Sequence, residues 1–551
     1  MKAPHADPTV ANFIARRSAQ CAYRVFTARQ VIWYFLLASV LVLFFLYDWL
    51  YALTTINLIA AGFYFSVISY KCIVVLLAVF RRREIVVTPE QLATLSDDDL
   101  PLYTILVPLY REPHVASKII SYINAFDYPP EKLDVKLLLE ENDEATIAAC
   151  RGVYLPECYE IIVVPHSLPK TKPKACNHGL LAARGEFLVI YDAEDRPEPD
   201  QLKKAVYAFR GEPENVACLQ AKLNYYNPYQ NTLTRWFTIE YTAWFDLYLP
   251  GLHALGVPIP LGGTSNHFRT DILRKLDGWD PFNVTEDCDL GVRLHSEGYR
   301  TKVLDSTTWE EANSRVGNWI RQRSRWVKGY LQTHLVHMRN PLALFWRLGP
   351  KNFVSFLLTV GGLGAMLILN PIYWIIGLVY LSLLLTDVIA AHGPTDELAW
   401  RMLFLSPKDD PFWSGISLIF FVVTWVLVCA NLLFIFINVL ACHKRGYRRL
   451  IPLALLSPIY WVVISIAAWK GFIQLFTNPF YWEKTVHGLF SEPPVPETAI
   501  PIEPEVILEA PEPIFAPIVE GSREYERIAD AQDPEVGKQG SQPEEHPPDP
   551  R

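Results

Sequence analysis

The chain has 551 residues, of which 51% are hydrophobic, and its mean hydropathy is positive. This hydrophobicity is high for a purely soluble protein, and the length allows more than one domain. The net charge of −8 is uneven: the segment 491–551 holds 15 acidic against 4 basic residues and 13 of the 42 prolines. We expect this tail to be a disordered, solvated appendage.

Long apolar blocks flank the middle of the chain. A helix needs about 20 mostly apolar residues to cross a bilayer. The block 353–391 is about twice that length and carries Asn370-Pro371 near its centre, which predicts a hairpin of two helices. All blocks together predict six transmembrane helices, in the segments 31–53, 56–80, 353–391, 412–440 and 451–476.

Basic residues indicate which flanks of these helices face the cytoplasm. Four arginines lie between residues 16 and 29, and "RRRE" (81–84) follows the second block. "HKRGYRR" (443–449) would face outward if the count of six is right, against the same rule. The predicted layout is a cytosolic segment 1–30, two helices in 31–80, a cytosolic domain 85–350, four helices in 351–476, a segment 477–490 and the tail 491–551.

Residues 102–350 alternate β-branched apolar runs with helical stretches, which predicts an α/β domain with a largely parallel, Rossmann-like sheet. Ligands bind such sheets outside the carboxyl ends of the strands. The predicted strands are 103–110, 135–143, 159–165 and 185–195, and a helix at 112–126 follows the first. Three strand ends carry polar groups, namely Tyr110, Arg111 and Glu112, then Glu140 and Glu141, then Asp192, Glu194 and Asp195.

The last of these ends reads "YDAEDRPEPDQL". If the strand continues through it, Asp192 and Glu194 point to one face and Asp195 to the other. Two carboxylates at such a strand end can hold Mg²⁺ or Mn²⁺, with waters and nucleotide phosphates in the remaining positions. An acidic turn closed by Pro197 and Pro199 explains the same residues without a ligand.

Two loops offer further ligand groups. "LPKTKPKACNHGL" (168–180) places Lys170, Lys172 and Lys174 before a helix expected to begin near Ala175, an arrangement that suits phosphate. A solvated basic loop is the alternative. "PLGGTSNHFR" (260–269) would let a ligand approach the backbone closely, although a plain turn explains it as well.

The segment "NVTEDCDLGVRLHSEGYRT" (283–301) predicts a helix with its cap at Asn283 or Thr285 and Glu286, Asp287 and Asp289 in the first turn. The helix dipole stabilises acids there, which is sufficient as a structural explanation. The functional interpretation is a general base, a carboxylate placed to take a proton from a hydroxyl.

Further along, "VGNWIRQRSRWVKGYLQTHL" predicts a helix with Gln322, Arg325 and Trp326 on one face, at i, i+3 and i+4. This face carries an amide, a guanidinium and a flat aromatic ring. It either lies on lipid headgroups or forms one wall of a pocket for a polar, anionic ligand.

The order of these motifs resembles the membrane-embedded family 2 glycosyltransferases, the group of cellulose, curdlan and hyaluronan synthases. The resemblance covers residues 100–330 in detail and the flanking helices in layout; Gln-x-x-Arg-Trp is its most specific part and Thr-Glu-Asp the next. It implies a GT-A fold that transfers a sugar, with inversion, from a nucleotide diphosphate sugar.

The resemblance also implies residue roles. Asp287 is similar to the base that deprotonates the acceptor hydroxyl, and Asp192 and Glu194 to the ligands of the metal and diphosphate. Arg325 would pair with the leaving diphosphate, and Trp326 would stack on the acceptor sugar beside Gln322. The other implied substrate-binding positions are Tyr110, Glu112, Glu140, Glu141, Lys174 and Glu286.

Two departures from the family pattern leave assignments open. The usual Asp-x-Asp is Asp-x-Glu here, followed by Asp195, so either Glu194 or Asp195 is the second metal ligand. The early Asp-Asp pair is Glu140-Glu141. "NPFYWEKTVHG" (478–488) resembles the gate of hyaluronan-type synthases, with Trp482 and Thr485 over the nucleotide; an interfacial anchor is the alternative.

These features favour a processive β-glucan synthase of the bacterial inner membrane. It would use UDP-glucose, extrude the growing glycan chain across the lipid bilayer to an envelope export partner, and bind no nucleic acid. Non-processive transfer of one sugar to a lipid carrier is one alternative. A catalytically degenerate membrane scaffold is another, although Asp192, Asp287 and Arg325 are all present.

Overall fold

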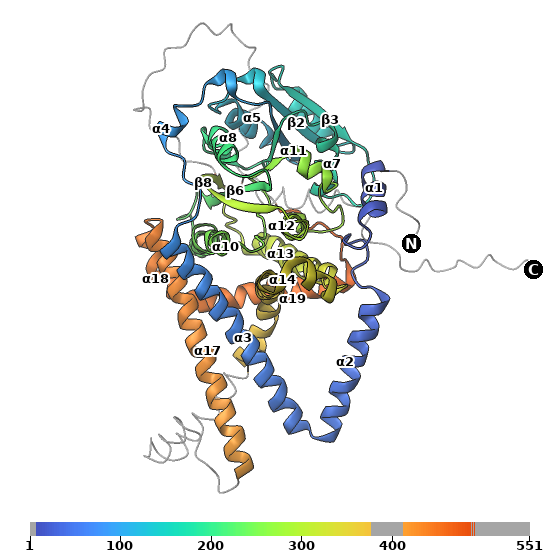
Figure 1. Ribbon diagram of the computed structural model, residues 1–551, viewed down its shortest axis with the longest axis vertical. Helices are drawn as coiled ribbons and strands as arrows, with labels where there is room; N and C mark the ends of the chain where they lie inside the picture. The colour runs from blue at the N-terminus through green and yellow to red at the C-terminus, as the bar shows by residue number, and fades with distance from the viewer. Residues whose placement is uncertain (1–6, 376–410, 486–487, 489, 491–551) are drawn as a thin grey trace, which may run out of the picture. The chain divides into compact units, whose positions relative to one another are not determined.

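The computed structural model describes residues 7–375, 411–485, 488 and 490. Within them a mixed sheet has the strand order β3-β2-β1-β4-β7-β6-β8-β5 (Figure 1). The strands are β1 Tyr103–Leu109, β2 Leu133–Glu140, β3 Tyr159–Val164, β4 Phe187–Ile190, β5 Arg196–Pro197, β6 Val216–Tyr225, β7 Asn266–Arg269 and β8 Arg300–Glu310.

The four predicted strands form the parallel half of this sheet, β3-β2-β1-β4. Every residue of β2 is buried, as expected of a strand covered on both faces. The other half is mixed: β7 runs antiparallel to β4 and β6, β6 is parallel to β8, and β5 is antiparallel to β8. The prediction of a largely parallel sheet is therefore right for only half of it.

Helices cover both faces of the sheet. Ile105 and Val107 of β1 pack with α5 and α8, whereas Leu106 between them packs with α7, α11 and α12. This alternation follows from the period of two in a strand. The helices up to this point are α1 Pro8–Arg17, α2 Ala28–Tyr47, α3 Trp49–Arg81, α4 Pro89–Leu92, α5 Ala116–Asn124, α6 Glu144–Arg151, α7 Lys172–Ala182, α8 Gln201–Gly211, α9 Thr232–Thr242, the π-helix η3 Ala243–Tyr248, α10 Leu249–Leu255, α11 Thr270–Lys275 and α12 Glu286–Ser296.

Two of these boundaries correct the sequence prediction. The predicted strand 185–195 ends at Ile190, because the backbone N–H of Asp192 donates to the side chain of Asp195 (2.7 Å) and closes a turn. The strand alternation expected for Asp192, Glu194 and Asp195 is therefore wrong. Helix α7 begins at Lys172 rather than near Ala175, with Pro173 in its first turn, where proline is well tolerated.

The remaining helices lie beside the sheet or extend away from it (Figure 1). Helix α19 packs along α13, and the close approach requires Gly471, where a methyl group would lie 2.5 Å from the carbonyl oxygen of Ser324. These helices are α13 Val316–His337, α14 Pro341–Phe356, the π-helix η4 Leu357–Gly361, α17 Pro411–Lys444, α18 Ile451–Ala454 and α19 Ser457–Thr477.

Four described helices are long and apolar enough to cross a membrane: Ala28–Tyr47, Tyr51–Arg81, Pro341–Ile375 and Ser457–Thr477. The prediction was six, and part of it falls on residues 376–410, outside the described chain. The turn predicted at Asn370-Pro371 is wrong, because the helix continues through both residues to Ile375. Proline is tolerated in apolar helices when neighbouring groups satisfy the freed carbonyl.

Both ends of α19 contact the sheet domain and its adjoining helix α13. Just before α19, the carbonyl oxygen of Leu453 accepts a hydrogen bond from the indole of Trp236 (3.1 Å). Just after it, the carbonyl oxygen of Asn478 accepts one from Lys328 (3.2 Å). The apolar block 451–476, predicted as the last crossing, thus begins and ends against the same part of the molecule.

The basic segment 443–449 also lies on the sheet-domain side. Lys444 pairs with Glu84 (3.3 Å), directly after α3, and Arg445 makes a bidentate ion pair with Asp246 at 2.9 and 2.8 Å. The expectation that this segment faces away from the domain is wrong, because α17 ends beside the end of α3. The basic flanks then all lie on one side, as the charge rule requires.

Candidate active site

The turn after β4 presents its carboxylates unequally. Asp195 is fully buried, and its Oδ2 accepts hydrogen bonds from the backbone N–H of Asp192 and from the hydroxyl of Thr264. Its Oδ1 is buried without a hydrogen-bond partner. Asp192 and Glu194 are partly exposed. Asp195 therefore shapes the turn, and the other two carboxylates are the ones open to a ligand.

Lys172, the first residue of α7, reaches this turn. Its ammonium forms an ion pair with Asp192 and donates to the carbonyl oxygen of Gly263 (2.7 Å). Burial lowers the pKa of Lys172, but the charges of Asp192 and Glu286 outweigh burial and raise that pKa, so the side chain is a cation. The Gly-Gly-Thr-Ser loop and the acidic turn are thereby joined by one charged group.

Gly263 also borders Asp287, near the start of α12. A methyl group on residue 263 would lie 3.5 Å from Oδ2 of Asp287 and 3.9 Å from Nζ of Lys172. The other carboxylate oxygen, Oδ1, accepts from the backbone N–H of Cys288 (2.6 Å). One oxygen of Asp287 is thus anchored by its helix, and the second borders the space that the missing side chain of Gly263 leaves open.

Arg325 of α13 supplies the second cation of this region. Burial lowers its pKa, and the charges of Glu286, Asp192 and Asp287 act in the opposite direction. Its guanidinium carbon lies 4.4 Å from the ring centre of Trp482, a cation–π contact. The structure therefore brings together Asp192, Asp287 and Arg325 from three separate motifs.

Carboxyl groups are crowded together at this site. Burial raises the pKa of Glu286 to about 8, with a contribution from Asp287, and raises the pKa of Asp287 to about 6 against the opposing effects of its backbone hydrogen bond, Lys172 and Arg325. Burial and the neighbouring carboxylates also raise the pKa of Glu310 far above its usual range. Carboxyl groups held together in this way bind protons or cations readily.

The site fits a divalent cation by its donor chemistry. Its carboxylates are hard oxygen ligands, and Oδ1 of Asp195 is an orphaned buried acceptor. Within the described ranges no three His, Cys, Asp or Glu side chains converge as a ready-made metal centre. Asp192 and Glu194 thus offer the accessible ligands and Asp195 a buried one, and the three do not form a closed coordination sphere by themselves.

The remaining predicted residues of the parallel half form a neighbouring edge. Tyr110 and Glu112 both contact Lys484, whose ammonium lies 5.4 Å from the ring centre of Tyr110 and 3.0 Å from Oε1 of Glu112. Glu140 is buried and pairs with Lys174 (3.1 Å). Glu141 is instead exposed and accepts from the backbone N–H of His166 (2.9 Å).

The predicted face of α13 is partly an aromatic wall. The ring of Trp326 stacks on Tyr241, with ring centres 5.9 Å apart, and touches Phe237 at 6.0 Å. Gln322 is 8% exposed, and its amide oxygen has no hydrogen-bond partner. Arg323, three residues before Trp326, packs its guanidinium on the rings of Trp326 (4.5 Å) and Phe237 (4.8 Å) and forms an ion pair with Glu240.

The segment after α19 passes along this wall. Glu483 pairs with Lys470 (2.5 Å) and accepts from the hydroxyl of Ser324 on α13 (3.2 Å). Thr485 is 2% exposed, and its hydroxyl has no hydrogen-bond partner. The two predicted gate residues, Trp482 and Thr485, thus flank a segment that is tied to α13 and α19.

Sequence reasoning missed two site residues. Lys172 was recognised only as part of a basic loop, and its neighbour Lys174 was chosen for the site; Pro173, which marks the first turn of α7, was the signal available. Glu310 ends β8, a strand that was not predicted. Its position beside the acidic turn depends on pairing between β5 and β8, which no local pattern indicates.

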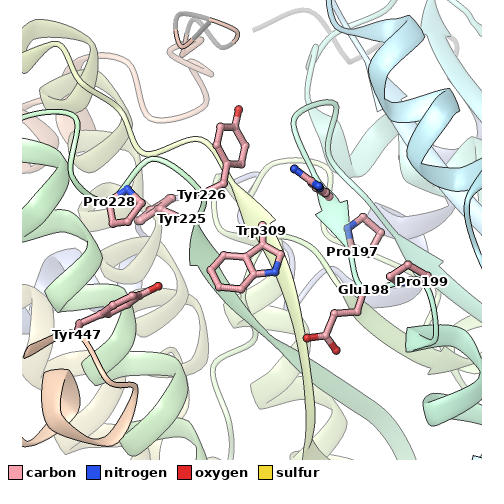
Figure 2. Close-up of a pocket in the computed structure, with 9 residues that line it drawn as sticks. Pro197, Glu198, Pro199, Tyr225, Tyr226, Pro228, Trp309 and Tyr447 are labelled. Atoms are coloured by element: carbon pink, nitrogen blue, oxygen red, sulfur yellow. The ribbon is translucent and has the colours of Figure 1, made fainter. Parts of the chain in front are cut away.

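A separate cavity of about 470 Å³ lies at the ends of β5, β6 and β8. Figure 2 shows Trp309 in the middle of its wall, between Tyr447 and Pro228 on one side and Pro197 and Glu198 on the other. Trp309 and Glu310 are consecutive in β8, and consecutive strand residues face opposite ways. The cavity is therefore distinct from the acidic site.

The chain matches the family model of glycosyl transferase family group 2 over residues 187–473, more than half of its length. The match includes the acidic turn, Asp287 and Arg325. The chain therefore belongs to glycosyl transferase family group 2, and the prediction of an enzyme of the glycosyltransferase class is confirmed. The sheet domain has the expected GT-A-like α/β fold.

Curated relatives agree with this class. The "Probable glycosyltransferase YdaM" of Bacillus subtilis is 26% identical over 46% of this chain and 60% of its own. A beta-monoglucosyldiacylglycerol synthase of Trichormus variabilis is 26% identical over 47% and 56%. A glucomannan 4-beta-mannosyltransferase of Oryza sativa is 27% identical over 42% and 41%. The chain thus spans roughly half of each relative's length.

Solved structures are more distant. A mannosyltransferase from Pyrobaculum calidifontis, in complex with GDP-Man and Mn²⁺, is 18% identical and aligns with a TM-score of 0.36 over 68% of this chain and 99% of its own. Glucosyl-3-phosphoglycerate synthase from Mycobacterium tuberculosis, in complex with Mn²⁺ and UDP, is 14% identical with a TM-score of 0.29 over 48% and 83%.

Proposed function

We propose that this protein is an inverting, processive glycosyltransferase that polymerises sugar from a nucleotide diphosphate sugar, with UDP-glucose as the first donor to test, into a β-glucan that leaves through the membrane. The observation that carries the proposal is that Asp287 and Lys172 meet beside Gly263, while Arg325 is near enough to interact with Asp287 and Asp192. A base and two cations are what transfer of a sugar from a diphosphate to a hydroxyl requires.

Asp287 acts as the general base in this mechanism. Its free oxygen takes the proton of the acceptor hydroxyl while that hydroxyl oxygen attacks the anomeric carbon of the donor. The new C–O bond forms as the bond between the anomeric carbon and the diphosphate breaks. Because burial raises the pKa of Asp287 to about 6, it is a stronger base than an exposed carboxylate and is still ionised at neutral pH.

Arg325 and Lys172 stabilise the leaving diphosphate, whose negative charge grows in the transition state. Asp192 and Glu194 would hold Mg²⁺ or Mn²⁺, which supplies further charge neutralisation when bound. Tyr110, together with the pair of Glu140 and Lys174, would contact the nucleotide at the neighbouring edge of the sheet.

Processive synthesis is supported by the acceptor side of the site. Trp326 is partly exposed and is backed by the buried rings of Tyr241 and Phe237, so a sugar ring can stack on it, and Trp482 covers Arg325 from the segment after α19. This aromatic wall is continuous with the apolar helices through α13 and α19. We propose that these helices lie in the bacterial inner membrane with the sheet domain in the cytoplasm, so that the product passes between them.

The decisive test is a donor panel on membranes that carry the protein. Each radiolabelled UDP-sugar and GDP-sugar is supplied with Mg²⁺ or Mn²⁺, and Asp287→Asn serves as the control. We expect long product from UDP-glucose that β-glucan-specific enzymes digest and that the variant does not make. Long product from another donor would correct the sugar, and no turnover of any donor by well-folded protein would refute the proposal.

Transfer of one sugar to a lipid carrier is a second candidate, favoured by one observation. A relative that matches 47% of this chain is named a beta-monoglucosyldiacylglycerol synthase. In the same assay this activity would give short, solvent-extractable product whose yield depends on added diacylglycerol.

A further inference from the structure

The cations and carboxylates of the site are not balanced. Six carboxyl groups interact there, and Lys172 and Arg325 are two cations that act on them. The carboxyl groups are Asp192, Glu194, Asp195, Glu286, Asp287 and Glu310. A divalent cation would relieve this excess, yet the carboxylate best placed to bind one, Asp192, is already engaged by an ammonium group.

The local fold fixes the backbone of Lys172 so that its side chain reaches Asp192. The hydroxyl of Thr171 donates to the carbonyl oxygen of Pro281 (2.8 Å), and Pro173 follows in the first turn of α7, so the backbone of Lys172 is fixed. Its side chain is only 13% exposed. Its ammonium contacts Asp192 and the carbonyl oxygen of Gly263, both at the acidic site.

The two cations differ in how easily they can move. Arg325 is covered by Trp482, and its planar guanidinium has little freedom to reorient. Lys172 carries a compact charge on a flexible stem of four carbons. The ammonium can therefore leave Asp192 for another anion within reach while its backbone stays in place.

We propose that Lys172 is an internal counter-ion that occupies Asp192 until a nucleotide diphosphate arrives, and that it thereby prevents the divalent cation from binding to the free enzyme. The diphosphate draws the ammonium onto its own oxygens, which frees Asp192 for the cation. This inference rests on the proposed function. Its consequence is an order of binding, in which the cation enters only together with the nucleotide.

The same contact explains how the acidic cluster persists in the free enzyme. Without a counter-ion, Asp192 would bring an unpaired negative charge close to Asp287 and to the buried carboxyl groups of Glu286 and Glu310, whose raised pKa values keep them largely protonated. An ion pair at the partly exposed edge of the cluster offsets this repulsion. Lys172 is therefore a positioning residue for the six carboxyl groups, and it also competes with the divalent cation for Asp192.

The experiment measures binding and needs no turnover. Full-length protein in detergent is titrated with Mn²⁺, and the free cation is followed by electron paramagnetic resonance, with and without UDP or GDP. We expect the wild type to bind Mn²⁺ weakly alone and at least about tenfold more tightly with one nucleotide. Lys172→Met should bind Mn²⁺ alone at least about tenfold more tightly than the wild type, because a neighbouring positive charge has been removed.

Two controls make the result specific. Lys204→Met removes a partly buried lysine that pairs with Glu198 and Asp200 outside the cluster, and it should leave Mn²⁺ affinity unchanged. Adding Asp192→Asn to Lys172→Met should abolish the gain. Thermal unfolding of each variant identifies any that do not fold, and for Lys172→Gln the same gain is expected with a polar side chain retained.

The proposal is overturned if Lys172→Met and Lys172→Gln bind Mn²⁺ with wild-type affinity, or if the wild type binds Mn²⁺ equally well with and without both nucleotides. These outcomes are distinct from failure of the proposed function. If the protein transfers no sugar but binds Mn²⁺ in the expected order, the counter-ion role of Lys172 is supported and the proposed polymerase activity is refuted. If the protein transfers sugar but shows no order of binding, the activity is supported and the counter-ion role is refuted.

Discussion

At the scale of single residues, the site depends on one carboxylate with two different oxygens. Oδ1 of Asp287 is anchored by the backbone of its own helix, and Oδ2 borders the space beside Gly263. Burial raises its pKa to about 6, which the adjacent cations oppose without cancelling. This placement and this pKa are what the proposed role of Asp287 as the general base requires, and its neighbours set the pH at which it would be ionised.

The pH dependence of transfer follows from this pKa. Below about pH 6 Asp287 is protonated and cannot accept a proton, so the rate should rise as pH increases through about 6 and then level off. The measurement is initial rate at saturating donor from pH 5 to pH 9. A rate that is flat between pH 5 and pH 7 would contradict the assignment of Asp287 as base.

Asp287→Asn should lower the rate by roughly 10²- to 10⁴-fold, because the amide cannot accept the proton, whereas donor binding should change little. Donor binding can be followed with UDP, either by the change in intrinsic Trp fluorescence or by calorimetry. Loss of UDP binding along with the rate would indicate a structural role instead.

Gly263→Ala tests the open space directly. The added methyl group would make ordinary contacts with Asp287 and Lys172, at 3.5 and 3.9 Å, so the protein should fold normally. It would occupy the place that substrate needs, so KM for donor or acceptor should rise at unchanged melting temperature. Gly211→Ala, where a methyl group has no neighbour within 4 Å, is the matched control.

At the scale of elements, the position of α12 depends on its contact with α13. Gly329 of α13 lies so close to Thr285, the cap of α12, that a methyl group would be 2.4 Å from the Thr285 side chain. His337, at the end of α13, also bonds to Asp289 of α12 (2.9 Å), which in turn pairs with Arg293 (2.7 Å). The helix with the base and the helix with Arg325 are thus one unit.

Gly329→Ala should displace the start of α12 and with it Asp287. Overpacking of this kind costs about 1–3 kcal/mol. At a temperature well below unfolding, where the variant remains folded, we expect the rate of sugar transfer to fall even though little protein is lost to unfolding. Gly317→Ala on the same helix has no neighbour within 4 Å and should leave activity unchanged. Equal activity in both variants would show that α12 tolerates the shift.

At the scale of the whole molecule, several distant segments meet on the side of the sheet domain. Asp7, before α1, bonds to His178 of α7 (2.8 Å), and Lys444, at the end of α17, pairs with Glu84 after α3. Helices α3 and α17 therefore end together. If they cross a bilayer, both leave it on the side of the active site.

This arrangement predicts a cross-link. In the double variant Glu84→Cys with Lys444→Cys, a short bifunctional maleimide should join the two positions, because the tips of the wild-type side chains are 3.3 Å apart and such a reagent bridges the distance that the two long side chains span. After cleavage of the chain between them, the fragments should stay together on a non-reducing gel. The single variants control for the native thiols. A double variant that never cross-links would contradict the conclusion that α3 and α17 end next to each other.

The sequence by itself determined the class of protein and predicted which residues would carry its chemistry. Strand period, apolar blocks and the order of Asp-x-Glu, Thr-Glu-Asp and Gln-x-x-Arg-Trp are local signals, so they predicted β1 to β4, the helical face of α13 and the importance of Asp287 and Arg325. Only the tertiary structure decided which lysine of the basic loop meets Asp192, that Asp195 is turned inward, that β8 brings Glu310 to the acids, and that residues 443–449 return to the sheet domain. Each of these depends on contacts between segments far apart in the chain, whose pairing is set by packing and burial over the whole fold rather than by any pattern within a window of sequence.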